Sequence, residues 1–405
     1  MKTRTRTLLA SSLILGVLAG PASAPGHAAT GRAAAATVRG DNTVDDTTVG
    51  DADSHALAAA IAGLPREDTT AALVRVGGTE GTWRGSAGVH DLASGRPADP
   101  DARFRAGSVT KVFTAATALQ LVGERKLSLD RTVRSYLPAL VPATYAGVTV
   151  GQLLNHTSGI PAADMPGGTV EEWYAHRFDP HTPQEMVASA TAKEPEFAPG
   201  RSQHYLNINY NLLGLLIEKV TGDRYAHQVS ARILRPLGLD STYFPEGEAR
   251  IRGPHNHGYQ LFPAADGTTG LRDVSVWGTA DAWAAGDIVS TTADLERFTR
   301  ALFQGRVVRG PLLEEMFTLP DRCVHMYGSG APAQYSAGLS VMTLGGREVW
   351  GKTGGRYGYN TAIAATRDLS RTLVYSVNST DAKGEELNPT ALNIIIAAYG
   401  APSAP

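Results

Sequence analysis

Ser108 and Lys111 stand three residues apart at the start of a predicted helix, where they could act as a nucleophile and its base. Apolar residues recur at helical spacing through Ser108–Gly123, so the Lys111 amine can reach the Ser108 hydroxyl on one helix face. Serine needs a base to remove its proton, and lysine can be that base only if burial or nearby positive charge lowers its pKa. Backbone N–H groups at the helix start could stabilise an oxyanion. The pair alone also fits a helix cap followed by a solvated lysine.

Tyr205 and Asn207 lie in a loop directly before a second predicted helix, Asn209–Val220. A tyrosine near a lysine could be held as a phenol of low pKa and carry protons for the serine and the leaving group. The Asn207 amide could bond to both the lysine and a substrate carbonyl. Taken alone, this segment fits a packed aromatic residue and a helix cap better.

Lys352, Thr353, Gly354 and Gly355 end a predicted strand and enter a predicted tight turn. A free strand edge here could pair with a peptide-like substrate, and the Gly355 N–H could complete an oxyanion hole with that of Ser108. Lys352 and Thr353 would offer a positive charge and a hydroxyl to a substrate carboxylate. The two glycines permit close backbone approach. The alternative is a strand-end lysine followed by an ordinary turn.

The three motifs, in this order and at these separations, resemble those of the penicillin-recognising serine enzymes. The most similar branch holds class C β-lactamases, secreted D-alanyl-D-alanine carboxypeptidases and related esterases, and the resemblance covers the chain from about His55 to Ala398. It implies a β-lactamase-like α+β fold, with an antiparallel sheet flanked by helices and an all-helical region beside it. It also implies that Ser108 is acylated, that Lys111 and Tyr205 exchange protons, and that neither metal nor cofactor takes part.

The acylating substrate is not settled by these motifs. Carboxypeptidases of the branch often carry histidine in place of Lys352, which is the residue of class C β-lactamases, and the preceding predicted strand, Tyr335–Leu344, lacks an arginine to anchor a substrate carboxylate. Arg356 is a further candidate anchor. Thr110–Ala115 and Asn155–Gly159 favour the carboxypeptidase group. We therefore predict a D-alanyl-D-alanine carboxypeptidase acting on cell-wall-type peptides, with a β-lactamase, an esterase or a non-catalytic penicillin-binding protein as alternatives.

The elements that position these residues divide the chain into a sheet region and a helical insertion. We predict sheet segments at about 55–126 and 284–400, and a mostly helical insertion at about 127–283. A last helix is predicted to begin at Asn388 and Pro389 and to reach Tyr399. The predicted strands, bounded by glycine-rich or polar turns, are Thr69–Val76, Thr82–Val89, Tyr335–Leu344, Arg347–Lys352, Tyr359–Thr366 and Arg371–Asn378.

The first residues have the pattern of a secretory signal peptide. Lys2, Arg4 and Arg6 precede a short apolar run, and small residues follow as far as Ala29, so residues 1–29 are predicted to be removed on export. Residues 30–54 are small and polar, and we expect a disordered leader. We therefore predict a secreted protein without a stable membrane anchor.

Composition excludes several other classes of function. The 405 residues carry a formal net charge of −2, which gives no electrostatic footprint for nucleic acid.

The single cysteine, Cys323, cannot form an internal disulfide and is not expected to be a nucleophile. His255 and His257 fit a polar loop rather than a metal site, and His156 fits a structural hydrogen bond rather than a catalytic base. We expect a monomer that binds a small peptide, β-lactam or ester.

Overall fold

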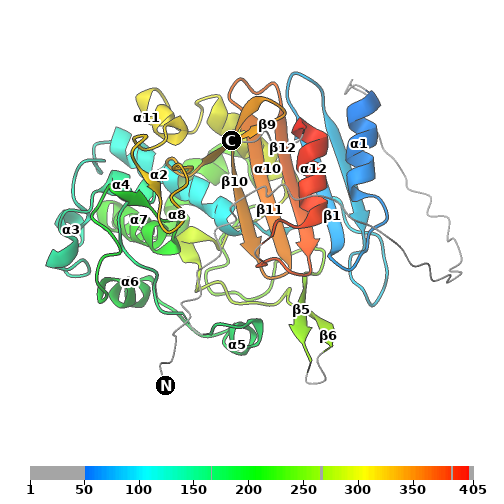
Figure 1. The fold of residues 1–405 in the computed structure, drawn as a ribbon, viewed down its shortest axis with the longest axis horizontal. Helices are drawn as coiled ribbons and strands as arrows, with labels where there is room; N and C mark the ends of the chain where they lie inside the picture. The colour runs from blue at the N-terminus through cyan, green and yellow to red at the C-terminus, as the bar shows by residue number, and fades with distance from the viewer. Residues whose placement is uncertain (1–50, 166, 265–267, 385, 401–405) are drawn as a thin grey trace, which may run out of the picture.

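Among the described residues, a six-stranded antiparallel sheet brings the first and last strands of the chain together (Figure 1). The computed structural model describes residues 51–400, except 166, 265–267 and 385. The first strand pairs with the last strand on one side and with the second strand on the other. In spatial order the strands are β2 (Trp83–Gly88), β1 (Thr69–Gly77), β12 (Thr372–Ser379), β11 (Tyr359–Thr366), β10 (Arg347–Arg356) and β9 (Ser340–Leu344).

Helices cover both faces of this sheet. On one face α1 (Asp51–Ile61) and α12 (Pro389–Tyr399) lie side by side, and α10 (Thr292–Phe303) packs on the opposite face (Figure 1). Val74 of β1 joins the core under α1 and α12, whereas its neighbour Leu73 joins the core on the other face. Because both faces are covered, the central strands β11 and β12 are buried along nearly their whole length rather than at every second residue.

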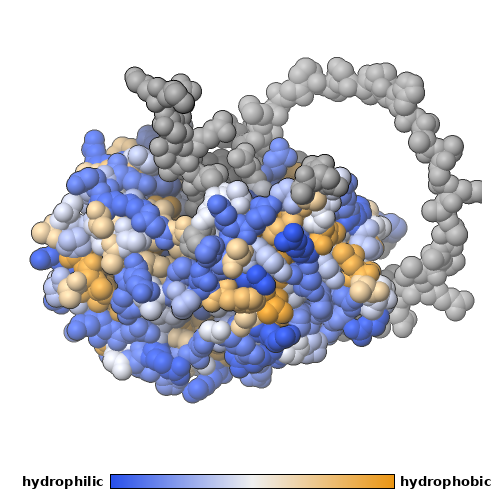
Figure 2. All heavy atoms as spheres, turned by 90° about the horizontal axis from the view of Figure 1, so that it is seen from below, coloured by the Kyte–Doolittle hydropathy of each residue, from blue (hydrophilic) through white to orange (hydrophobic). Residues whose placement is uncertain are grey.

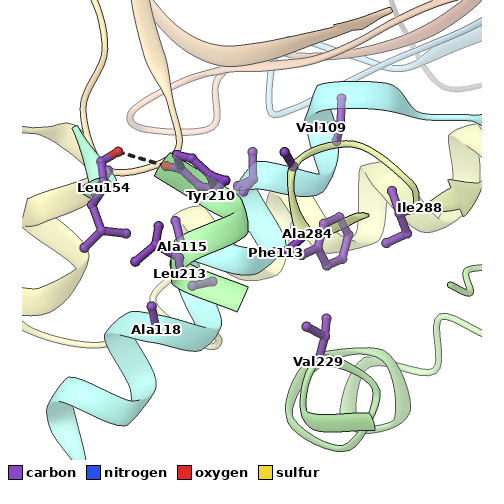
Figure 3. Packing of buried hydrophobic residues seen from close by; sticks show 14 of the residues in the cluster. Val109, Phe113, Ala115, Ala118, Leu154, Tyr210, Leu213, Val229, Ala284 and Ile288 are labelled. Carbon is purple, nitrogen blue, oxygen red and sulfur yellow. Dashed lines mark hydrogen bonds between the residues drawn. The ribbon is translucent and has the colours of Figure 1, made fainter. Parts of the chain in front are cut away.

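The helical region is built around α2 (Thr110–Gly123), which is buried on nearly every side. It packs against α7 (Asn207–Thr221) and the short turn η4 (Trp283–Ala285), and Figure 3 shows Phe113 beside Ala284 and Ile288. The Tyr210 hydroxyl of α7 donates to the Leu154 carbonyl (2.9 Å), which ties α7 to α4 (Val150–Leu154) (Figure 3). A helix that is apolar all round belongs in the middle of a core.

Short helices surround α2 and α7, and three of them begin with a capping box. Thr149, Thr169 and Thr182 each accept a hydrogen bond from the backbone N–H three residues on, where a Gln or Glu side chain bonds back. Besides α4, the short helices are α3 (Val133–Tyr136), α5 (Val170–Ala175), α6 (Pro183–Thr191), α8 (Tyr225–Val229), α9 (Arg235–Leu237) and α11 (Pro311–Glu314).

Short strand pairs join segments that are far apart in the sequence. The pair nearest Ser108 is β3 (Phe104–Arg105) with β7 (Val289–Ser290), which holds the residues before Ser108 beside those after η4. The other pairs are parallel β4 (Ser202–Gln203) with β8 (His325–Met326), and antiparallel β5 (Tyr259–Pro263) with β6 (Thr269–Asp273).

The structure confirms the predicted α+β class and the antiparallel sheet flanked by helices, and it corrects several element boundaries. β11 and α12 have the predicted extents, but the predicted strand Tyr335–Leu344 is a strand only from Ser340, and β5 with β6 forms an unpredicted hairpin. The helix α1 starts at Asp51, inside the predicted leader, because its apolar residues dock on α12. The predicted signal peptide, residues 1–29, lies outside the described residues.

Few large apolar side chains are exposed among the residues that the structure describes. Figure 2 shows a mostly hydrophilic face with small apolar patches. No helix within the described ranges has the length and apolar character needed to cross a membrane. The exposed large apolar residues are Leu92, Phe178, Leu271, Tyr327 and Ile396.

Removal of the Phe298 ring is expected to cost about 3–5 kcal/mol of unfolding free energy. Phe298 of α10 and Phe113 of α2 are fully buried and stack with ring centroids 3.7 Å apart, so Phe298→Ala leaves a cavity between the sheet and the helical region. Chemical denaturation measures the loss. The matched control is Phe178→Ala, at a side chain 52% exposed, and equal losses in the two variants would contradict this packing.

Candidate active site

Ser108 lies in the short turn η1 (Gly107–Val109), which connects β3 to α2. The Ala106 N–H donates to the Ile288 carbonyl (2.9 Å), so the turn is held next to β7 from its start. Gly107 has a φ of 52°, in the left-handed region that favours glycine. The predicted helix Ser108–Gly123 is therefore a 3-10 turn followed by α2, and this turn leaves Ser108 half-buried.

Gly354 and Gly355 of β10 lie directly against this turn, backbone to backbone. A Cβ placed on Gly354 would lie 2.0 Å from the Ala106 carbonyl oxygen and 2.9 Å from the Ser108 nitrogen. A Cβ on Gly107 would lie 2.7 Å from the Gly355 nitrogen. Only glycine fits these positions, and the contact brings the backbone N–H groups of Ser108 and Gly355 to one place, as an oxyanion hole requires.

The prediction that a tight turn follows Lys352–Thr353 is wrong, because β10 continues through both glycines to Arg356. The strand β9 pairs with β10 only as far as Gly351, so the described part of the chain leaves one edge of β10 unpaired from Lys352 onward. The predicted free strand edge is therefore present. It runs along the last residues of β10, from Lys352 to Arg356, and is not followed directly by the predicted turn. Gly354 and Gly355 allow the backbone of β10 to approach the turn that carries Ser108, and they do not reverse the direction of the chain.

The Lys111 amine is fully buried and meets three oxygen atoms. Its Nζ lies 2.7 Å from Asn207 Oδ1, 2.7 Å from the Ala285 carbonyl oxygen and 3.1 Å from Ser108 Oγ. The predicted partners Ser108 and Asn207 are thus brought together with Lys111. The Ala285 carbonyl was not predicted, because a backbone acceptor carries no signal of residue type.

Burial lowers the pKa of Lys111 well below its usual value, and the positive charges of Lys352 and Lys383 lower it further. A neutral amine has two N–H groups and one lone pair. The two N–H groups match the two shorter contacts, to oxygens of Asn207 and Ala285 that can only accept. In the neutral form of the amine, the lone pair would then face the Ser108 hydroxyl, which is the one partner of the three that can donate. Lys111 is therefore arranged as a base for Ser108.

Tyr205 lies beside both lysines of the site. Its ring centroid is 5.0 Å from Lys111 Nζ and 4.6 Å from Lys352 Nζ. The prediction of a low-pKa phenol is wrong: burial raises the pKa of Tyr205 well above its usual value, and Ser108 only partly offsets this. The hydroxyl is buried and makes no hydrogen bond of normal geometry with the described residues. Tyr205 is thus a neutral phenol that can donate a proton.

His156 packs against Tyr205 and supports the loop that carries it. The two ring centroids are 4.5 Å apart, and His156 Nδ1 accepts weak hydrogen bonds from the Leu206 N–H (3.4 Å) and Asn209 Nδ2 (3.3 Å). Burial lowers the pKa of His156 well below its usual value, and Lys111 and other cations lower it further. A neutral imidazole that accepts from the loop carrying Tyr205 agrees with the predicted structural role.

Two further lysines occupy the free edge of β10. Lys352 Nζ donates to the Thr353 carbonyl (2.9 Å), and Lys383 Nζ donates to the Gly355 carbonyl (2.8 Å). Burial lowers the pKa of Lys352 to about 7. Lys383 is an exposed residue, and desolvation of its amine, together with the charge of Arg356, lowers its pKa to about 8. No sequence pattern marks Lys383, which lies in the loop after β12.

The other candidate residues lie apart from this chemistry. Arg356 is not available as a carboxylate anchor, because its guanidinium is buried and bonds both oxygens of Asp281 (2.7 and 2.9 Å). Cys323 is exposed, and Asp321 raises the pKa of its thiol. His257 Nδ1 pairs with Asp273 (2.5 Å). Within the described ranges, no group of three or more His, Cys, Asp or Glu side chains could hold a metal ion.

Comparison with known proteins gives matches over most of the chain. A family model described as Beta-lactamase matches residues 33–395. A D-stereospecific amidohydrolase from a Streptomyces species shares 33% identity at a TM-score of 0.70, over 86% of this chain and 97% of that one. The D-amino acid amidase of Ochrobactrum anthropi SV3 shares 26% identity at a TM-score of 0.70, over 86% and 96%.

A curated relative is matched less completely. Penicillin-binding protein 4* of Bacillus subtilis is 28% identical over 306 residues, which are 72% of this chain and 64% of that protein. Other curated relatives are matched over 41% to 55% of their own length. This chain therefore spans about two fifths to two thirds of the length of these curated relatives.

Gly354→Ala is expected to abolish acylation of Ser108, because the new methyl group must displace the Ala106 carbonyl or move β10 away. A loss of at least about 100-fold in kcat/KM is expected when one oxyanion donor is misplaced. Gly147→Ala is the control, since a Cβ there meets no atom within 4 Å. Full activity of Gly354→Ala would show that the turn and the strand do not need this close contact.

Lys352→Met is expected to stabilise the fold near neutral pH. The pKa of Lys352 is about 7 when folded against 10.5 when exposed, so its burial penalty is complete below pH 7 and disappears as pH rises towards 10.5. The gain in unfolding free energy should therefore shrink between about pH 6 and about pH 10. Chemical denaturation across this pH range measures the unfolding free energy. Lys219→Met, at an exposed lysine, is the control. A gain that does not change with pH would contradict the assignment.

Proposed function

This chain belongs to the beta-lactamase family, and we propose that it is a serine hydrolase that cleaves the amide bond of a D-configured residue through an ester with Ser108. The observation that carries the proposal is the position of the buried Lys111 amine, whose Nζ lies 3.1 Å from Ser108 Oγ and 2.7 Å from both Asn207 Oδ1 and the Ala285 carbonyl oxygen. The membership also agrees with the resemblance seen in the three sequence motifs.

In the proposed acylation step, Ser108 Oγ attacks the substrate carbonyl carbon and its proton passes to Lys111 Nζ. The N–H groups of Ser108 and Gly355 hold the negative charge of the tetrahedral intermediate. The C–N bond then breaks, and the departing amine receives a proton from the neutral phenol of Tyr205, which recovers one from Lys111. A water molecule cleaves the ester by the same steps in reverse, and Ser108 is restored.

The named relatives support a D-configured acyl group. One is a D-stereospecific amidohydrolase and another a D-amino acid amidase, each matched over nearly its whole length. Within this class we propose a D-alanyl-D-alanine carboxypeptidase on cell-wall-type peptides, because Lys352 and Lys383 place positive charge where the carboxylate of a terminal residue could bind. A D-amino acid amidase, whose leaving group is ammonia, is the second candidate and is favoured by the relatives' names.

We also propose that the chain is exported and acts outside the membrane as a monomer. The basic start and the apolar run in residues 1–29 support export. A protein that acts outside the membrane would meet cell-wall peptides directly.

Fluorescent penicillin is expected to label the purified protein covalently, and Ser108→Ala is expected to abolish the labelling because no other nucleophile faces Lys111 among the described residues. Labelling is followed on denaturing gels. Turnover is then compared for a peptide ending in D-Ala-D-Ala, the same peptide with L-Ala before the bond, a D-amino acid amide, a cephalosporin and an aryl ester. Adducts in Ser108→Ala would refute the nucleophile, and equal turnover of the D- and L-peptides would refute the proposed stereochemistry.

A further inference from the structure

We propose that Lys383, in the loop between β12 and α12, is a specificity-determining residue that binds the carboxylate of the substrate at the free edge of β10. This inference rests on the proposed hydrolase function and selects among its substrates. It concerns a residue outside the three sequence motifs, brought to the site only by the fold. Its ammonium group reaches Gly355, whose N–H belongs to the oxyanion hole.

The free edge of β10 is occupied in a regular way. Thr353 and Gly355 are two residues apart, so their carbonyl groups point to the same edge. Each of these carbonyls accepts one hydrogen bond from a lysine, Lys352 or Lys383. These are the acceptors that the N–H groups of a peptide-like substrate would use in edge pairing. A substrate N–H that takes the position of the Lys383 ammonium at the Gly355 carbonyl therefore displaces it.

The displaced charge needs a new partner. Among the described residues, neither Lys352 nor Lys383 has a carboxylate within salt-bridge distance, and the nearby Asp281 is bound at both oxygens by Arg356. Positive charge next to Ser108 thus exceeds negative charge, and both lysines act on the pKa of Lys111. Of the two, Lys352 is buried, where a charge is normally paired, and Lys383 is exposed beside it, so an anion on the substrate would be a partner for this positive charge.

A substrate with both an N–H and a carboxylate exchanges these contacts one for one. Its N–H takes the Gly355 carbonyl, and its carboxylate takes the Lys383 ammonium. A substrate with a neutral amide instead of the carboxylate gains the first contact but offers the exposed ammonium no negative charge, so water alone solvates it. Lys383 therefore favours acids over neutral amides, which distinguishes the C-terminal residue of a peptide from an amino acid amide.

Lys383→Met tests this with two matched substrates, a peptide ending in D-Ala-D-Ala and the same peptide with a C-terminal amide. KM for the acid is expected to rise about 10- to 100-fold, the range of a lost charge-assisted hydrogen bond. KM for the amide is expected to stay the same or fall, because the Gly355 carbonyl becomes free. Lys383→Arg should keep the preference of the wild type, and the exposed Lys219→Met should change neither value.

The pH dependence separates Lys383 from its neighbours. The pKa of Lys383 is about 8, set by loss of water, by Arg356 and by Asp281, so the preference for the acid should decline above about pH 8 in the wild type. In Lys383→Met, this decline should be absent, although titration of Lys111 and Lys352 still changes kcat. A decline that is the same in both proteins would overturn the assignment.

Failure of the inference can be told from failure of the proposed function. If the wild type hydrolyses D-peptides and Lys383→Met keeps the same acid-to-amide ratio of KM, the function stands and the inference is wrong. If the wild type hydrolyses none, calorimetry with Ser108→Ala still decides, because it measures binding of the acid and amide peptides without chemistry. Acid binding that is weakened by adding Lys383→Met supports the inference, and equal or undetectable binding of both peptides overturns it.

Discussion

The backbone contact between β10 and the turn that carries Ser108 is the constraint on which the rest of the structure depends. It requires glycine at positions 107 and 354, because a Cβ at either would overlap backbone atoms of the other segment. The sheet fixes one side of this contact through the register of β10 with β11, and the β3–β7 pair fixes the other. The fold and the proposed oxyanion hole are therefore specified by the same two segments.

Burial of Lys111 is the second constraint, and the core of α2 makes it possible. A lysine in water stays charged and cannot act as a base at neutral pH. Here α2 is buried along its length, so water is excluded from the amine, and Lys352 and Lys383 add positive charge. The free energy lost by burying the amine is offset by apolar packing such as that of Phe113 on Phe298. Stability of the helical region thus keeps the pKa of Lys111 low.

The sequence predicted what depends on residue type and local spacing. Ser108 and Lys111 follow from helical spacing, and β11 and α12 from turn residues and caps at their ends. The extent of β10 could not be predicted, since Gly354 and Gly355 also fit a turn and only the opposing backbone explains them. The pKa of Tyr205 was predicted in the wrong direction because its burial depends on residues distant in sequence. Lys383 and the Ala285 carbonyl had no local signal at all.

Lysines on the free edge of β10 also reduce the risk that this unpaired strand edge pairs with another chain. An unpaired strand edge is a template for pairing with another chain, and charged side chains, lysine above all, prevent this. Capping Thr353 and Gly355 with ammonium groups closes the edge to an ordinary strand, which brings no charge to compensate. A small ligand with a carboxylate does bring that charge. Lys352 and Lys383 therefore hinder other chains from pairing with this edge. They still allow the substrate that the site is proposed to cleave to bind there.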